Sequence, residues 1–157
     1  MILYMKNHGV NVTVRLVVIK NNRLLTEYTK ENNFFFYIGG HMEHNETMLE
    51  ACLRETREEC GDEVEFKFQK ILYIRDFIWP EGDDHCVEIF VLGDINKFEE
   101  IEHRFDPEKE PGTHWLTWLS IDNLPDNLLP HPLTQKLLSD YKAGFPKEGE
   151  YVGRMDK

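Results

Sequence analysis

The sequence lacks three features that would point to whole classes of protein. Its three cysteines form no CxxC pair, and an odd number argues against a disulfide framework. The most aliphatic run, at residues 16–19, is far too short to cross a bilayer. The first ten residues, MILYMKNHGV, lack the basic start and long apolar stretch that are typical of a signal peptide. We therefore expect a cytoplasmic protein with reduced, packed cysteines and no membrane partner.

Positive charge is also scarce. The chain has 18 Lys and Arg residues against 29 Asp and Glu residues, so its net charge is −11. Such a surface does not attract nucleic acid polymers or anionic membranes. A small polyanionic substrate would need local positive charge, which bound cations can supply.

The length and composition indicate one globular domain over residues 1–157, because 41% of the residues are hydrophobic, 30% are charged, and no linker or repeat divides the chain. β-Branched and aromatic runs predict a hairpin at residues 10–28, further strands at 33–38, 64–68, 70–79, 85–95 and 114–121, and a turn at 80–84. A capping box and a terminal glycine predict a helix between Thr47 and Gly61, and a second helix is expected at 131–141. We expect a mixed sheet with helices on its faces, an acidic loop at 96–112 and an irregular tail at 142–157. The tail and strand edges offer surfaces for a homodimer, although the sequence leaves the oligomeric state open.

The first helix ends in a cluster of acidic residues. At about 100° per residue, Glu59 falls inside the apolar arc of this helix, Glu55 falls at its edge, and Glu58 lies about 60° further out. The alternative is a solvated face, but solvation alone would put all three glutamates on the far side. The C-terminal end of a helix is also electronegative, so three carboxylates there are unfavourable without a counterion.

A divalent cation would remove this repulsion. Carboxylate oxygens are the ligands that Mg²⁺ and Mn²⁺ prefer. Arg54 precedes Glu58 by four residues and can hold carboxylates in position. Gly39 and Gly40 allow a close approach of the backbone, so a free carbonyl there could complete the coordination of a metal.

This stretch resembles the signature of the Nudix (MutT-like) hydrolases. The matching residues are Gly40, Glu46, Arg54-Glu55, Glu58-Glu59 and Gly61, and all seven stand at the correct spacing. The resemblance implies the α/β/α sandwich of that family with a mixed β-sheet. Thr56 and Asp62 stand where the family prefers apolar residues, so we expect Val64 to take the core position that Asp62 cannot.

The resemblance also implies an activity, namely the hydrolysis of a pyrophosphate bond in a nucleoside diphosphate that is linked to another moiety. Glu55, Glu58 and Glu59 would bind Mg²⁺, with Mn²⁺ able to substitute, and Glu55 would help to activate water. The Gly40 carbonyl would be a further metal ligand, and Glu46 would pair with Arg54. Members of the family often use an acidic residue from a later loop, for which the candidates are Glu108 and Glu110.

The substrate is less well defined by the sequence. A small nucleotide-derived molecule is expected: a nucleoside triphosphate, ADP-ribose, a nucleotide sugar or a similar compound. His41, Arg75 and Trp79 are the candidates for substrate binding, through phosphate contact, proton transfer or base stacking. The alternatives are surface exposure for His41 and Arg75 and a position in the core for Trp79. The alternative function is a non-catalytic Nudix-type module that binds or senses a nucleotide, although such a module has no need of the complete acidic set.

Overall fold

A β-hairpin is the first element of the computed structural model, which describes residues 9–80, 84–101, 104–107 and 109–156. Strand β1 (Asn11–Lys20) is followed by β2 (Arg23–Thr29), and the two pair antiparallel. Asn21 and Asn22 join them with φ values of 50° and 60°. Positive φ at both positions is what a tight two-residue turn between right-handed twisted strands requires. The hairpin expected from the sequence is confirmed.

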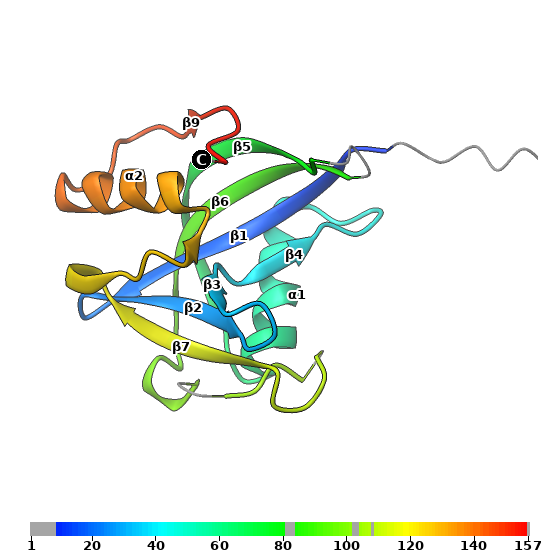
Figure 1. The fold of residues 1–157 in the computed structure, drawn as a ribbon. Helices are drawn as coiled ribbons and strands as arrows, with labels where there is room; N and C mark the ends of the chain where they lie inside the picture. Colours follow the sequence, from blue (N-terminus) through cyan, green and yellow to red (C-terminus); the bar gives the residue numbers. More distant parts are fainter. Residues whose placement is uncertain (1–8, 81–83, 102–103, 108, 157) are drawn as a thin grey trace, which may run out of the picture.

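Nine strands in the described residues form one sheet, in the order β8-β3-β2-β1-β6-β5-β9, with β4 paired to β1 and β7 paired to β2 (Figure 1). The sheet is mixed, because β1 runs parallel to β6 while β5 runs antiparallel to β6. The strands after the hairpin are β3 (Phe34–Phe36), β4 (Gly39–His41), β5 (Phe66–Ile78), β6 (His85–Ile95), β7 (His114–Ser120), β8 (Leu128–Leu129) and β9 (Glu150–Tyr151).

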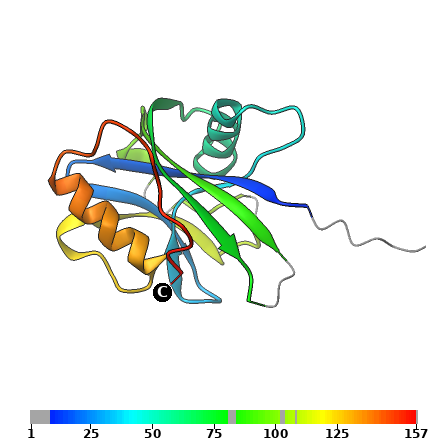
Figure 2. The ribbon, with the colours of Figure 1, turned by 90° about the horizontal axis from the view of Figure 1, so that it is seen from above.

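Helices α1 (Met48–Cys60) and α2 (His131–Lys142) cover opposite faces of this sheet (Figure 2). Side chains of β1 point alternately to the two faces of the sheet. Val14 and Leu16 pack in the core under α1, whereas Val17 packs in the core under α2. Two short 3₁₀ helices, Glu99–Ile101 and Ile121–Asn123, complete the elements of the described chain. The expected α/β/α sandwich is confirmed.

The ends of α1 follow the sequence prediction. The Thr47 hydroxyl accepts a hydrogen bond from the Glu50 amide, and the Glu50 carboxylate accepts one from the Thr47 amide. At the other end Gly61 has a φ of 121° and donates to the Arg57 carbonyl. Asp62 is exposed and Val64 is buried, so the core position is taken as expected.

The strand expected at 33–38 is shorter in the structure, since β3 ends at Phe36, and the two glycines that follow belong to a separate strand. The chain continues as β4, in which Gly39 pairs with Arg15 and Gly40 with Val14. Gly39 has a φ of 130°, and a Cβ atom there would overlap the Val14 carbonyl. The two glycines therefore let the chain change its partner strand from β2 to β1, where side chains would have ended the pairing.

Two other segments also differ from expectation. The two strands predicted at 64–68 and 70–79 are one strand, β5, whose pairing with β6 shifts at irregularities near Lys70 and Tyr73. The tail is not wholly irregular, because Glu150 and Tyr151 pair with the edge of β5. Edge pairing uses main-chain groups, so a two-residue strand leaves no side-chain pattern in the sequence. The predicted turn at 80–84 includes residues 81–83, which lie outside the described residues.

The cysteines and helices agree with the composition. All three cysteines, Cys52, Cys60 and Cys86, are buried and unpaired. Neither α1 nor α2, the α-helices of the described chain, has the length and apolarity that crossing a bilayer would need.

Candidate active site

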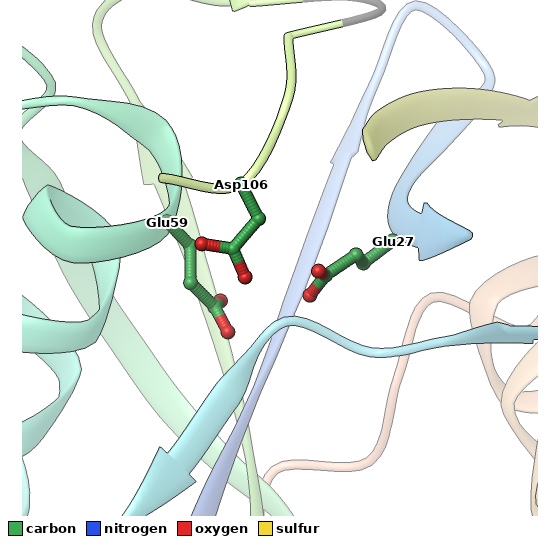
Figure 3. Close-up of side chains that lie close together, drawn as sticks. All are labelled: Glu27, Glu59 and Asp106. Atoms are coloured by element: carbon green, nitrogen blue, oxygen red, sulfur yellow. The ribbon is translucent and has the colours of Figure 1, made fainter. Parts of the chain in front are cut away.

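Three buried carboxylates from distant parts of the sequence converge between α1 and the sheet. They belong to Glu27 on β2, Glu59 in the last turn of α1 and Asp106 before β7, and they point toward one another (Figure 3). One oxygen of each lies within 4.8 Å of the others. The exposed fractions of the three residues are 0%, 6% and 3%. This is an oxygen-rich centre that bulk water reaches poorly.

Local structure brings each of these side chains to the centre. Strand alternation puts Glu27 on the same side of β2 as Leu25, which packs in the core under α1. The Asp106 amide donates to the His114 carbonyl, so the loop runs beside the start of β7, and β7 in turn pairs with β2. Glu59 lies on the buried side of α1, as its position in the helical arc predicts.

Ionisation of Glu27 and Glu59 is unfavourable in the protein alone. Burial raises the pKa of Glu27 to about 8, with a contribution from the neighbouring Asp106 carboxyl. Burial also raises the pKa of Glu59 well above its usual range, and Glu27 and Glu55 add to that effect. No N–H or alcohol group of the described chain donates to either oxygen of Glu27. A cation bound here would favour the ionised carboxylates.

A second group of carboxylates gathers around Arg54, beside the first. The Nε and Nη2 atoms of Arg54 donate to the two oxygens of Glu46 at 2.7 and 2.9 Å, which is the forked geometry that arginine forms with carboxylates. Its Nη1 atom donates to Glu55 at 2.7 Å and to Glu58 at 3.0 Å. The Nη2 atom also donates to the His41 carbonyl. Arg54 therefore ties the end of β4 and the loop before α1 to the acidic face of the helix.

Strand β4 connects the two groups. The Gly39 amide donates to Glu59 Oε2 at 2.8 Å. Gly40 lies so close to Glu55 that a Cβ atom at position 40 would overlap its carboxylate. Glu55 is 7% exposed, and burial raises its pKa while Arg54 lowers it. Glu58 is the most exposed of the three predicted metal ligands, with 37% of its side chain accessible.

A cavity of about 560 Å³ opens beside this acidic region. Part of its wall is aromatic, and the aromatic residues come from or adjoin strands β3, β5, β6 and β7: Phe34, Phe36, Tyr37, Phe77, Trp79, Phe90 and His114. Arg15 lies between the cavity and the acids, since it lines the cavity and its Nη1 atom donates to the Tyr37 and Gly39 carbonyls. Burial is the main effect on the pKa values of Glu27 and Glu55, and the charge of Arg15 opposes it at both.

The three residues predicted to bind substrate all line this cavity, but they differ in exposure and in their contacts. His41 is exposed, and its Nδ1 atom lies 2.9 Å from the Thr13 hydroxyl. Trp79 is 49% exposed and its ring stacks edge-on against Phe77. Arg75 is only 4% exposed, and its Nε atom already donates to Glu88 at 2.6 Å. Arg75 therefore forms part of the cavity floor.

Among the described residues of the later loop, the acidic side chain that reaches Glu59 is not one of the predicted candidates. Glu108 lies outside the described residues, and Glu110 is exposed and does not belong to the buried centre. The residue that the loop brings to Glu59 is Asp106. Glu27 was not anticipated at all. The sequence signal for Glu27 was a single acidic residue at an inward-facing position of a strand, in LLTEYT. Such a residue indicates a site only once the helix packed on that face is known to carry Glu59.

Stability without metal should depend on pH through Glu27. A folded-state pKa near 8 exceeds the usual value for a glutamate, so the folded protein binds a proton more tightly than the unfolded chain. In EDTA, the free energy of unfolding should therefore fall as the pH rises from about 5 to 8. Glu27→Gln should reduce this fall, though not abolish it, since Glu59 remains. Urea denaturation at several pH values measures the effect.

The control for this experiment is Glu31→Gln, which changes an exposed glutamate just after β2. It should follow the wild type at every pH. The assignment is refuted if the free energy of unfolding changes with pH by the same amount in Glu27→Gln and in the wild type across the whole range.

Comparison with known proteins agrees with this geometry. A family model described as the NUDIX domain matches residues 9–140. Among solved structures, the chain is similar to a NUDIX hydrolase from Nitrosomonas europaea, with a TM-score of 0.66 and 22% identity over 88% of this chain and 94% of that one. It is also similar to a MutT NUDIX hydrolase from Burkholderia pseudomallei, with a TM-score of 0.64 and 23% identity over 83% and 97% of the two chains.

A third similar structure is an ADP-ribose pyrophosphatase from Streptococcus suis, with a TM-score of 0.64 and 16% identity over 92% of this chain and 100% of that one. At these identities the structural likenesses show the fold, which is the Nudix type of α/β/α sandwich. The family match covers most of the chain and includes the whole acidic motif. The chain belongs to the NUDIX family.

Proposed function

We propose that this enzyme hydrolyses a pyrophosphate bond in a nucleoside diphosphate linked to another moiety, and that it requires Mg²⁺, for which Mn²⁺ can substitute. One observation supports this most strongly. Glu59 of the family motif meets two further buried carboxylates, Glu27 and Asp106, beside a cavity large enough for a nucleotide. Buried carboxylates this close to one another suit a hard divalent ion, which prefers oxygen ligands.

The donors fit such an ion well. Glu55, Glu58 and Glu59, with the Gly40 carbonyl, form the set that the motif implies, and Glu27 and Asp106 extend it. When bound, the ion would neutralise phosphate charge and lower the pKa of a water molecule. Arg54 and Glu46 would act as positioning residues, because their forked ion pair holds the acidic side of α1 against the segment after β4.

Proton transfer can be assigned to an atom of the chain. Glu55 Oε1 accepts the hydrogen bond from Arg54, so we assign Oε2 as the proton acceptor for the attacking water. The burial that raises the pKa of Glu55 also makes this carboxylate a better base. Arg15 would face the phosphates from the cavity side, because it lines the cavity and its charge favours ionised Glu27 and Glu55.

The cavity suggests where the rest of the substrate binds. Trp79 and the phenylalanine rings offer stacking surfaces to a base, and His41 stands at the edge nearest β4. The substrate class is a small nucleotide derivative. Its candidates remain a nucleoside triphosphate, ADP-ribose, as in the name of the Streptococcus suis relative, or a nucleotide sugar. The net charge of −11 argues against a nucleic acid polymer.

A substrate panel tests this function. Nucleoside triphosphates, ADP-ribose and nucleotide sugars should each be incubated with Mg²⁺, with Mn²⁺ and with EDTA, and the products separated by chromatography. A triphosphate would release phosphate or pyrophosphate, whereas ADP-ribose or a nucleotide sugar would give a nucleoside monophosphate and a sugar phosphate. We expect turnover of at least one compound, loss of that turnover in EDTA and its recovery when Mg²⁺ is added in excess. Full activity in EDTA would refute the metal requirement. Tight nucleotide binding without turnover under every condition would favour the non-catalytic alternative.

A further inference from the structure

The segment 150–156, here called the C-terminal strap, lies beyond the part of the chain that the family model matches. It runs along the edge of β5, opposite β6 (Figure 1). Glu150 and Tyr151 pair with β5, the Val152 amide donates to the Ile74 carbonyl, and the Asp76 amide donates to the Gly153 carbonyl. The Tyr151 hydroxyl also donates to the Asp76 carboxylate at 2.6 Å. The strap is therefore fixed in place by main-chain and side-chain bonds.

The strap delivers a carboxylate to the nucleotide cavity. Arg75 donates from Nη1 to the Arg154 carbonyl at 2.9 Å, which fixes the end of the strap over β5. Asp156 follows, lines the cavity, and keeps 26% of its side chain accessible. Its Oδ2 atom accepts from Arg154 Nε at 2.7 Å, and its Oδ1 atom lies 3.8 Å from Arg75 Nη1.

Charges alternate across the cavity floor from β1 to the strap. Arg15 on β1 donates to Glu88 on β6 at 3.1 Å, Glu88 accepts from Arg75 on β5 at 2.6 Å, and Asp156 stands beyond Arg75. Strands β6 and β5 separate the two ends of this row. Arg15 marks the end beside the catalytic acids, and Asp156 marks the end away from them.

The positive end of this row, at Arg15, and its negative end, at Asp156, suit different parts of a substrate. Phosphate groups would bind at the end near Arg15, because the acids that would hold a cation lie beside it. A carboxylate repels phosphate, but it accepts hydrogen bonds from amino and hydroxyl groups. Such groups belong to the base and sugar of a nucleoside, and Trp79 and Phe77 line the same cavity with stacking surfaces.

We propose that the C-terminal strap is part of the substrate site, and that Asp156 determines specificity by accepting a hydrogen bond from an amino or hydroxyl group of the nucleoside. This inference rests on the proposed function for the identity of the ligand. The competing explanation is that the strap only protects the open edge of β5. In that case Asp156 would matter for stability and not for the choice of nucleotide.

Binding of nucleoside diphosphates tests the proposal without depending on turnover. The probes are matched pairs in which one member lacks a single donor group: ADP and the diphosphate of unsubstituted purine riboside, CDP and the diphosphate of 2-pyrimidinone riboside, and ADP against its 2′-deoxy and 3′-deoxy forms. Calorimetry should show that Asp156→Ala weakens binding of the donor-bearing member of one pair by about 10- to 100-fold, the usual range for a hydrogen bond to a charged group. Its partner should bind nearly as before. Asp156→Asn keeps an acceptor oxygen and should retain intermediate affinity.

The matched control is Glu150→Gln. This residue belongs to the same strap, but its carboxylate pairs with Lys136 of α2 at 2.8 Å and does not line the cavity. It should leave every affinity unchanged. The proposal fails if Asp156→Ala keeps all affinities within about twofold, if it weakens both members of every pair equally, or if Glu150→Gln has the same effect.

Hydrolysis measured on the same variants separates this proposal from the function. Wild-type protein that binds the probes through Asp156 but hydrolyses no compound of the panel would leave the strap proposal standing and refute the function. Normal hydrolysis with unchanged discrimination in Asp156→Ala would do the reverse. Absence of all nucleotide binding in the wild type would refute both.

Discussion

Glu59→Gln should lower kcat by at least about 100-fold while the protein stays folded. Glutamine preserves the size of the side chain and can still accept the hydrogen bond from the Gly39 amide, but it removes one negative charge from the buried centre. Metal affinity and charge stabilisation should both fall. Glu58→Gln should also lose most turnover. Steady-state rates on the best substrate of the panel, together with thermal unfolding, measure these effects.

Glu50→Gln is the control for both variants. It makes the same chemical change on the same helix, at a capping-box position that tolerates either residue. Its rate should stay within about twofold of the wild type, as expected for a surface change. If Glu59→Gln and Glu58→Gln keep the full rate, the acidic end of α1 is not the metal site.

Arg54→Lys should lower both activity and stability, although it keeps the positive charge. Lysine cannot reproduce the fork that binds both oxygens of Glu46 while also reaching Glu55 and Glu58. We expect about a 10- to 100-fold loss of kcat and, because 22% of the Arg54 side chain is accessible, a modest loss of about 1–2 kcal/mol in the free energy of unfolding. Urea denaturation and steady-state kinetics provide the two readings.

Arg57→Lys provides the comparison for this variant. Arg57 lies on the exposed side of the same helix, so the substitution changes the same residue type without touching the network. Stability and rate should both remain close to wild type. Equal behaviour of Arg54→Lys and Arg57→Lys would show that a positive charge is sufficient at position 54 and that its forked geometry has no role.

The local elements of the fold were predictable because each has a short-range signal. The Asn-Asn turn defined the hairpin, and Thr47, Glu50 and Gly61 defined the two ends of α1. The helical arc also predicted correctly that Glu59 and Glu55 are more buried than Glu58. Strand β4 was missed, because a glycine pair is typical of a turn that ends a strand. Only the position of β1 beside these glycines shows that they pair with it.

The candidate site was predictable only where its residues lie close together in the sequence. The spacing of Arg54 and Glu58 predicted that they are neighbours on α1, and the family resemblance implied that Glu46 pairs with Arg54; the structure shows both contacts. Glu27 and Asp106 were not predicted as site residues, because the sequence around each of them contains no motif. Glu110 is no less acidic than Asp106, and only the pairing of the loop with β7 decides which of the two reaches Glu59.

The sequence by itself determined the family, the acidic helix and the ion-pair network that holds it, since these depend on residues within one helical turn or one loop of each other. Tertiary structure alone decided which other carboxylates meet Glu59, where the cavity opens, and that the strap reaches its far end. The physical reason is that contacts between residues far apart in the chain follow from the order and register of strands. That order is set by the packing of the whole sheet, and no local pattern encodes it.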